Sequence, residues 1–599
     1  MAGMTTDVTN LGETLGRELL PAVRNPAQYI GLEANARRAD PAAAEVAVAL
    51  AFPDTYTIGI SHLGSAVLYR QLNDTPGVAA DRTYCPQVDA EAVMRRRGIP
   101  LFGWESRLPL SRFDLIGFSL PYELCVTNVL TMLDLAGLPL RAADRDGRCP
   151  LIVGGDALAD SPEPVAPFFD VLIPGDGERP MGELVALLAE AKRDGRPREQ
   201  LLLDVARGVP SAYVPSLYAP GPGGRPEPTR DDIPAEIDRA CLSAFADTPA
   251  VTRPLVPVSE GVHERVVIEV MRGCPHGCRF CQAGHTRLPV RWRPVEEVVA
   301  AAREALAATG YREISLLSLS TGDYPQLGEL IDRLNAEFAG RHVSISLPSL
   351  HVDSQLKHLP KLTSEVRKGG LTIAAEAGSE RLRRAIGKRI TTADMIDGVR
   401  AAYQAGWQKV KVYFMAGLPG ERQDDIDAIV DLCRQLSDAR RDVDGQRGNI
   451  SASVSWLVPK PHTPMQWNAM QTAEYFFAVK DRLRQLTRKG PVQMKFHHVE
   501  RSLLEAVLCR GGREIADVIE AVWRDGARLD AWNEHFDHQR WFDALAAADV
   551  DVDALIHTER APGVPLPWSH IGCPRSEDTL ARQRERMRSE EHTSELQSH

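Results

Sequence analysis

Three cysteines at a short, regular spacing are the residues of this chain best suited to chemistry. Cys274, Cys278 and Cys281 form a C-x3-C-x2-C pattern in MRGCPHGCRFCQAGH, directly after RVVIEV, a short apolar run that predicts a buried strand. Thiolates are the protein ligands of iron–sulfur clusters, and four of them normally saturate a 4Fe–4S cube. Three cysteines therefore predict a 4Fe–4S cluster with one iron open to an external ligand.

The residues between the cysteines suit such a cluster. Gly273 and Gly277 allow the backbone to wrap closely around it, and Pro275 stiffens the turn. Phe280 is expected to pack beside the cluster and to limit the access of water. Zinc is the competing interpretation, because His285 completes a C-x3-C-x2-C-x3-H pattern that suits a structural Cys3His site.

Composition and charge narrow the class of protein. Seven of the ten cysteines are scattered, as expected of reduced, buried side chains in a chain without a secretion signal. No apolar run approaches the roughly 20 residues that span a bilayer, and the polar N-terminus matches no targeting peptide. We therefore expect a cytoplasmic protein with no membrane partner. A net charge of −11 gives no global case for nucleic-acid binding.

The first half of the chain predicts a Rossmann-like domain. After a polar, helical leading segment (1–40), short apolar runs alternate with helical patterns over residues 41–205. The expected strands are EVAVALAF, DLIGFSL, LIVGGD and DVLIPGDGE. This alternation predicts an α/β fold with a doubly wound parallel sheet. Residues 206–258 are rich in Pro, Gly and Asp and are expected to form a linker.

A second alternating series begins at RVVIEV and continues through EISLLSLS, HVSISLPSL, GLTIAAEAG, KVKVYFMAG and NISASVSWLVP. These six β/α units, over residues 259–488, predict a partial (β/α)6 TIM-type barrel with its active site at the strand carboxyl ends. Residues 489–575 predict a small helical accessory domain, and residues 576–599 a tail. The last segment, 588–599, resembles the translation of a sequencing adapter and is set aside from fold reasoning.

The cysteine loop, its place after the first strand of the second series, and the segments that follow resemble the radical S-adenosylmethionine (SAM) superfamily. The resemblance implies that the open iron binds the amino and carboxylate groups of SAM. Reductive cleavage of SAM then yields methionine and a 5′-deoxyadenosyl radical, with electrons from an external donor. It also implies SAM contacts at the loop and at the strand ends: Phe280, Ser320, Thr321, Gly322, Asp323, Glu376, Arg381, Lys388, Arg389, Met415, Gly417, Pro419 and Glu421.

Segments of the first series, such as FPDTYTIGISHLG and PGDGE, resemble the cobalamin-binding-type domain of one uncharacterised radical SAM group, and VPKPHTPMQW in the second series matches the same group. This implies a corrinoid in the crevice at the strand carboxyl ends. The implied pocket residues are Ser119, Tyr122, Glu123, Gly154, Gly155, Gly175 and Glu178. The segment around His62 does not match D-x-H-x-x-G, so cobalamin is expected to bind without a histidine on cobalt. His351 stands where this group is expected to have arginine.

These features favour a cobalamin-dependent radical SAM enzyme. Methylation of an unactivated carbon is the commonest chemistry of that architecture, and rearrangement or ring chemistry after hydrogen abstraction is the alternative within the class. Two further interpretations stay open. One is a scaffold or binding protein stabilised by zinc or an inert cluster, and the other is an RNA-modifying radical SAM enzyme without cobalamin.

Overall fold

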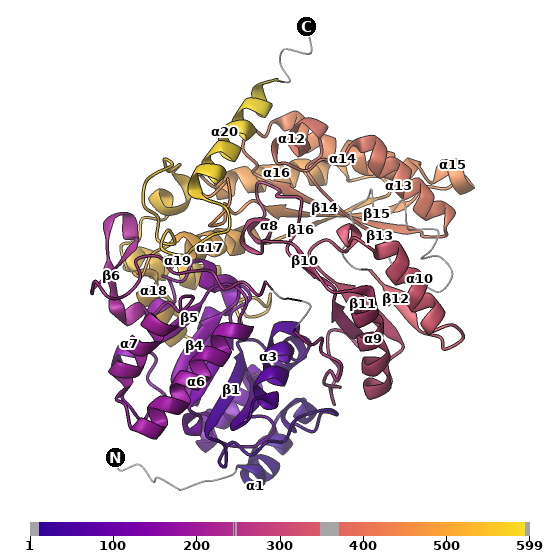
Figure 1. Cartoon of the computed structure of the whole chain (residues 1–599). Helices are drawn as coiled ribbons and strands as arrows, with labels where there is room; N and C mark the ends of the chain where they lie inside the picture. Colours follow the sequence, from indigo (N-terminus) through magenta and orange to yellow (C-terminus); the bar gives the residue numbers. More distant parts are fainter. Residues whose placement is uncertain (1–10, 244, 246–247, 348–370, 594–599) are drawn as a thin grey trace.

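The computed structural model describes residues 11–243, 245, 248–347 and 371–593. Two bodies of parallel strands and covering helices lie next to each other, and helices from the C-terminal part of the chain contact both of them (Figure 1). The carboxyl ends of the strands in the first body face the second body across a cavity, which is described below.

The first body is built on a five-stranded parallel sheet in the order β2-β1-β3-β4-β5. Its strands are β1 (Val46–Phe52), β2 (Val78–Tyr84), β3 (Leu115–Ser119), β4 (Leu151–Gly155) and β5 (Val171–Ile173). All seven residues of β1 are buried, as expected of a central strand covered on both faces. The strand order reverses between β1 and β3, which makes this the edge where such sheets bind ligands.

Helices cover both faces of this sheet. On one face α3 (Leu63–Asp74) packs beside α6 (Glu178–Asp194), and on the other α4 (Val88–Arg97) packs beside α5 (Val126–Leu135). The prediction of a Rossmann-like, doubly wound parallel sheet is confirmed.

In the described residues, the second body contains two parallel sheets, ordered β12-β11-β8 and β13-β14-β15-β16, and a short antiparallel pair of β9 (Met271–Arg272) with β10 (Arg291–Trp292). The strands of the parallel sheets are β8 (Val266–Glu269), β11 (Glu313–Leu317), β12 (Ser344–Ser346), β13 (Leu371–Glu376), β14 (Lys409–Ala416), β15 (Asn449–Trp456) and β16 (Val492–Phe496). Helices α9 (Val295–Thr309), α10 (Leu327–Glu337), α13 (Thr392–Gln404), α14 (Gln423–Asp438) and α16 (Ala473–Leu486) alternate with them. The partial barrel-type series is confirmed, and the described strands do not form one closed ring.

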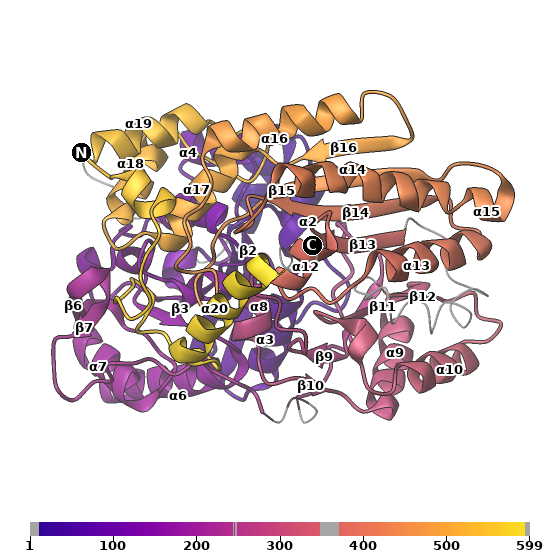
Figure 2. The same ribbon diagram turned by 90° about the horizontal axis from the view of Figure 1, so that it is seen from above.

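Three parts of the expected domain division differ from the described structure. The second body extends past residue 488, because β16 pairs with β15. Residues 206–258 are not a loose linker: α7 (Arg198–Gly208) reaches into them, β6 (Tyr218–Pro220) pairs with β7 (Pro226–Pro228), and Tyr213 and Ile237 are buried. In the expected tail, α20 (Glu577–Thr593) packs on α12 (Glu380–Ala385), as Figure 2 shows. The composition of such a segment can indicate that long helices or strands are absent. It does not indicate whether the segment packs against the rest of the protein.

The C-terminal helices α17 (Val499–Arg510), α18 (Ile515–Arg524) and α19 (His538–Ala547) attach mainly to the first body. Thr127 on α5 donates a hydrogen bond to Asp530 over 2.6 Å, and the Trp523 indole donates to Thr131 over 3.0 Å. The accessory helices therefore cover α5 as a third packed layer. Among the described helices, none is both long enough and apolar enough to cross a membrane.

The segment after β7 returns to the first sheet and closes its edge. Ala240 N–H donates to Pro174 O over 2.9 Å, and Asp176 N–H donates to Ala240 O over 3.0 Å. Gly175, at φ +99°, lies so close that a Cβ there would come within 2.1 Å of Ala240 O. A glycine is therefore required where this segment docks beside β5.

Gly175→Ala is expected to lower the free energy of unfolding by about 3 kcal/mol or more, because it combines a positive φ with a backbone overlap. Gly195→Ala is the matched control: Gly195 has φ +65° but nothing within 4 Å of its added Cβ. Its cost should be roughly 1–2 kcal/mol. Urea denaturation of both variants measures the difference, and equal losses would contradict the docking described above.

Buried neutral histidines predict acid sensitivity of the contact between the bodies. His462 Nε2 lies 2.7 Å from Asp160 O of the first body, and burial lowers the pKa of His462 to about 4. Because the pKa is near 6.5 in the unfolded chain, the unfolded state binds more protons between pH 6.5 and 4. The contribution of neutral His462 to the free energy of unfolding is therefore complete above pH 6.5 and is lost as the pH falls toward 4. His462→Gln should flatten the dependence of unfolding free energy on pH by on the order of 3 kcal/mol, measured by denaturation at pH 7 and pH 4.5.

Candidate active site between the two bodies

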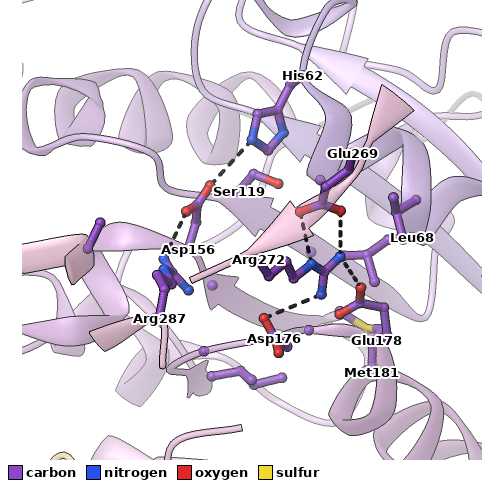
Figure 3. Close-up of a pocket in the computed structure, with 18 of the residues that line it drawn as sticks. His62, Leu68, Ser119, Asp156, Asp176, Glu178, Met181, Glu269, Arg272 and Arg287 are labelled. Carbon is purple, nitrogen blue, oxygen red and sulfur yellow. Dashed lines mark hydrogen bonds and ion pairs between the residues drawn. The ribbon is translucent and has the colours of Figure 1, made fainter. Parts of the chain in front are cut away.

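A cavity of about 400 Å³ separates the two bodies and touches both. This volume falls in the range of small-molecule sites. The first body supplies the carboxyl ends of β3, β4 and β5, where the register aligns Ser119, Gly155 and Ile173 in one row. The second body supplies Glu269 from β8, Arg272 from β9 (Met271–Arg272), Gly273 of the cysteine loop, and Arg287 after α8 (Gln282–Thr286). Figure 3 shows the side chains of Ser119, Glu269, Arg272 and Arg287 around this cavity.

Five of the seven predicted corrinoid-pocket residues line this cavity: Ser119, Gly154, Gly155, Gly175 and Glu178. The other two lie elsewhere. The Tyr122 hydroxyl donates to Asp54, and the Glu123 carboxylate pairs with the Lys460 ammonium. Both partners also contact the accessory helical region: Asp54 accepts a 3.0 Å hydrogen bond from Trp532, and Lys460 lies 2.7 Å from Glu505 of α17.

Arg272 joins the two walls of the cavity. Its guanidinium lies 2.9 Å from Glu269 of its own body, and 2.6 Å from Glu178 and 3.3 Å from Asp176 of the first body (Figure 3). Burial alone would lower the pKa of Arg272, but Glu269 and Glu178 outweigh burial and hold it above its usual value. Arg291 adds a second tie, at 2.6 Å from Asp176. Sequence reasoning missed this clamp, since its partners are far apart along the chain.

The cysteine loop begins at a position that only glycine suits. Gly273 has φ +82°, and a Cβ there would come within 2.8 Å of Arg287 O and Pro289 O. Burial raises the pKa of all three thiols, that of Cys278 to about 12, and the Lys388 ammonium opposes this rise. The thiols influence one another electrostatically, so they are neighbours, although no three Cys, His, Asp or Glu side chains of the described ranges already converge as metal ligands.

The donor set suits a three-thiolate cluster better than zinc. His285, the only histidine that the zinc interpretation uses, is fully buried, and its Nε2 donates a hydrogen bond to Cys278 O over 3.1 Å. Burial lowers the pKa of His285 to about 4, which keeps the ring neutral. His285 therefore supports the backbone of the loop through Nε2, by its hydrogen bond to Cys278 O.

Several predicted SAM contacts do gather around this loop. Asp323, after β11, lies 2.6 Å from Nε2 of His276 inside the loop, and Ser320 donates to the same carboxylate. His276 was missed, although its place between two cysteines was the available signal. Thr321 is buried and bonds Ser318 over 2.9 Å, so it supports the turn that contains Gly322.

Glu376 and Lys388 lie together near the thiols. Their charged atoms are 3.8 Å apart, and both influence the pKa of Cys278 and Cys281. Glu376 ends β13 at a register shift with φ +66°, a strained conformation for a residue with a side chain. Phe280 of the loop packs in one small apolar cluster with Met415 of β14. The loop is thus flanked by β11, β13 and β14.

Other predicted SAM contacts have different partners. Arg381 pairs with Asp425 and donates to Gly420 O over 2.9 Å, and Arg389 is exposed. Glu421 accepts from the backbone of Gly417 over 3.2 Å and from Tyr475 over 3.2 Å, which closes its own loop around the half-buried Pro419. Burial raises the pKa of Glu421 to about 7. His351 lies outside the described residues.

Two family models match the bodies that form this site. Residues 268–433 match the radical SAM superfamily, and residues 64–215 match the N-terminal domain of radical SAM proteins. The chain belongs to the radical SAM superfamily. It is a radical SAM enzyme, and a 4Fe–4S cluster and SAM are the cofactors that this family implies.

Relatives extend over different parts of the chain. An uncharacterised protein of Methanocaldococcus jannaschii is 26% identical over 79% of this chain and 90% of its own length. A tRNA-2-methylthio-N(6)-dimethylallyladenosine synthase of Sorangium cellulosum is 31% identical over 33% of this chain, which spans 42% of that enzyme.

Two solved structures are similar over most of the chain. The radical SAM methyltransferase TsrM from Kitasatospora setae, with cobalamin and a [4Fe-4S] cluster bound, is 15% identical, with 91% of this chain and 99% of that chain covered and a TM-score of 0.48. The cobalamin-dependent enzyme OxsB is 12% identical over 92% of this chain and 80% of its own, with a TM-score of 0.49. Both TM-scores lie below 0.5, so neither structure decides what this chain binds.

Lys388→Met is expected to slow alkylation of Cys281 by iodoacetamide about threefold in the iron-free protein at pH 8. The ammonium lowers the thiol pKa, so its loss leaves less of the reactive thiolate. Mass spectrometry of the alkylated peptide measures the rate. Lys388→Arg should restore it, and Lys411→Met, on β14 away from the loop, is the matched control. An unchanged rate in Lys388→Met would show that the ammonium does not act on the thiols.

Proposed function

We propose that this radical SAM enzyme binds cobalamin in the cavity between the two bodies and methylates an unactivated carbon of its substrate. When bound, the cluster on Cys274, Cys278 and Cys281 supplies the electron that cleaves SAM to methionine and a 5′-deoxyadenosyl radical, and the corrinoid supplies the methyl group. The electron comes from an external donor.

One observation carries this proposal: a single cavity is lined both by the ligand-binding edge of a Rossmann-like sheet and by the strand and loop that bear the cysteines. Gly154 and Gly155 leave that edge of the sheet without side chains, and a Cβ on Gly155 would meet only Ile173 O, at 3.6 Å. A flat ligand lying on this edge faces the second body. Arg272 and its carboxylates close the wall and limit the access of water.

The state of His62 supports binding without a histidine on the metal. Its Nδ1 accepts a hydrogen bond from Ser65 N–H over 3.2 Å at the start of α3. In the neutral ring the proton therefore lies on Nε2, which faces Asp156 Oδ2 at 3.4 Å. Neither nitrogen offers a free lone pair to a metal, which agrees with the missing D-x-H-x-x-G pattern.

The first test is product analysis. Anaerobically purified, reconstituted protein with a strong reductant should form 5′-deoxyadenosine, and S-adenosylhomocysteine should appear only when cobalamin is added, because remethylation of the corrinoid consumes SAM. Cys281→Ala should abolish 5′-deoxyadenosine. Mass spectrometry of both nucleosides reads the result. Absence of both products from fully iron-loaded protein would contradict the proposal, and 5′-deoxyadenosine alone would remove its methyl-transfer part.

A second test reads cobalamin binding without turnover. Gly155→Leu places a side chain in the cavity and should lower the cobalamin retained per chain at least about tenfold, measured by absorbance after gel filtration, while iron content stays at the wild-type value. Cys281→Ala is the reciprocal control, with cobalamin retained and iron lost. Equal retention of cobalamin in wild type and Gly155→Leu would show that cobalamin does not bind in this cavity.

A further inference from the structure

Asp156 is held in a backbone conformation that residues with side chains rarely adopt. It directly follows β4, with φ +78° and ψ −151°. This region is essentially restricted to glycine, and departures from it cluster at ligand sites, where the surrounding structure imposes the strain. The neighbouring Gly154 and Gly155 show that this edge already contains glycines, so a carboxylate at position 156 calls for an explanation.

The carboxylate of Asp156 lies between two bodies and two donors. Oδ2 is 3.4 Å from Nε2 of His62 in the first body, and Oδ1 is 3.5 Å from Nη2 of Arg287 in the second (Figure 3). Burial raises the pKa of this carboxyl, but His62 and Arg287 outweigh burial and keep it below its usual value. Asp156 is therefore ionised, and both contacts are longer than a good charge-assisted hydrogen bond.

Arg287 differs from the other guanidinium groups on the cavity wall. Arg272 pairs with three carboxylates, and Arg291 pairs with Asp176 and donates to four backbone or sulfur acceptors. Within the described part of the chain, Arg287 pairs only with Asp156. It lines the cavity with 24% of its side chain exposed, so most of its N–H donors remain available to a ligand there.

We propose that Arg287, together with His62 Nε2–H, is a receptor for an anionic group of the ligand in this cavity, and that Asp156 is an internal counter-ion with which the ligand competes. The anionic group is a carboxylate or phosphate, because a planar guanidinium binds these in bidentate geometry. This inference deepens the proposed function, since it assigns a charged group to whatever occupies the cavity. The loose contacts of Asp156 allow it to yield, and the strained backbone holds it at the site between ligands.

The direct test uses inorganic phosphate and acetate as probes on the purified full chain. A ligand that binds the folded state raises Tm with its concentration, and calorimetry in a zwitterionic buffer gives the apparent affinity. Arg287→Gln is expected to weaken this effect at least about tenfold, the usual scale for a charge-assisted pair. Arg303→Gln removes an exposed arginine of α9 that pairs with Glu337, and it should behave as wild type.

Removal of the Asp156 counter-ion is expected to strengthen phosphate binding, the opposite of the effect of Arg287→Gln. Asp156→Asn should tighten phosphate binding about threefold or more, because the competing charge is lost. Asp156→Gly removes the same carboxylate, suits the backbone and should also raise Tm without any anion, so the test survives if Asp156→Asn folds poorly. No anion effect in wild type, or equal effects in wild type and Arg287→Gln, would overturn the receptor. Weaker binding in both Asp156 variants would overturn the counter-ion role.

Paired ligands then distinguish the sources of the anionic group. Loss of affinity in Arg287→Gln for cobalamin but not for cobinamide, which lacks the nucleotide phosphate, assigns the receptor to the corrinoid phosphate. Loss for SAM but not for decarboxylated SAM assigns it to the methionine carboxylate. An unchanged affinity for all four, with the phosphate effect present, assigns it to a carboxylate or phosphate of the substrate.

Failure of this inference and failure of the proposed function are separable. If wild-type protein forms 5′-deoxyadenosine and binds cobalamin, but anion binding does not depend on Arg287, the proposed function stands and the proposed anion receptor is wrong. If anion binding depends on Arg287 but the protein has no affinity for cobalamin, the proposed anion receptor stands and the proposed function is wrong.

Discussion

The clamp around Arg272 is the interaction on which the site depends. This side chain directly precedes the cysteine loop and is only 15% exposed, so its charge must be paired. Its partners come from both bodies: Glu269 from the second, and Glu178 and Asp176 from the end of β5 in the first. Because Arg272 pairs with carboxylates of both bodies, it ties the start of the cysteine loop to the edge of the first sheet that lines the cavity.

Two carboxylates near the cysteine loop have strained backbones. Asp156 directly follows β4 of the first body and Glu376 ends β13 of the second, and both have positive φ. Each lies near a cation that is close to the loop in sequence or space, Arg287 for Asp156 and Lys388 for Glu376. Strain of this kind persists where the surrounding structure imposes a position on a charge. These strand ends are therefore shaped for ligand contacts at a cost in local stability.

The sequence predicted the structure correctly where one residue type or one short pattern determines it. Long apolar runs such as β1 can be buried only in the middle of a sheet, and residues that follow parallel strands meet at one edge. It failed where partners are distant. Tyr122 and Glu123 follow β3 as pocket residues should, but Asp54 and Lys460 take their polar groups. The docking of Ala240 on Gly175 could not be predicted, because the composition of the segment that contains Ala240 indicates only irregular backbone.

The sequence by itself determined the chemistry of the loop and the class of fold, because cysteine spacing and strand periodicity are local properties that survive without tertiary contacts. Only the tertiary structure decided which charges face the cavity. His62, Asp156 and Arg287 come from three separate stretches of the chain and meet through ion pairs that leave no periodic pattern. Coulomb interactions depend on distance in space, so the folded arrangement of the two bodies was needed to reveal that these groups act together.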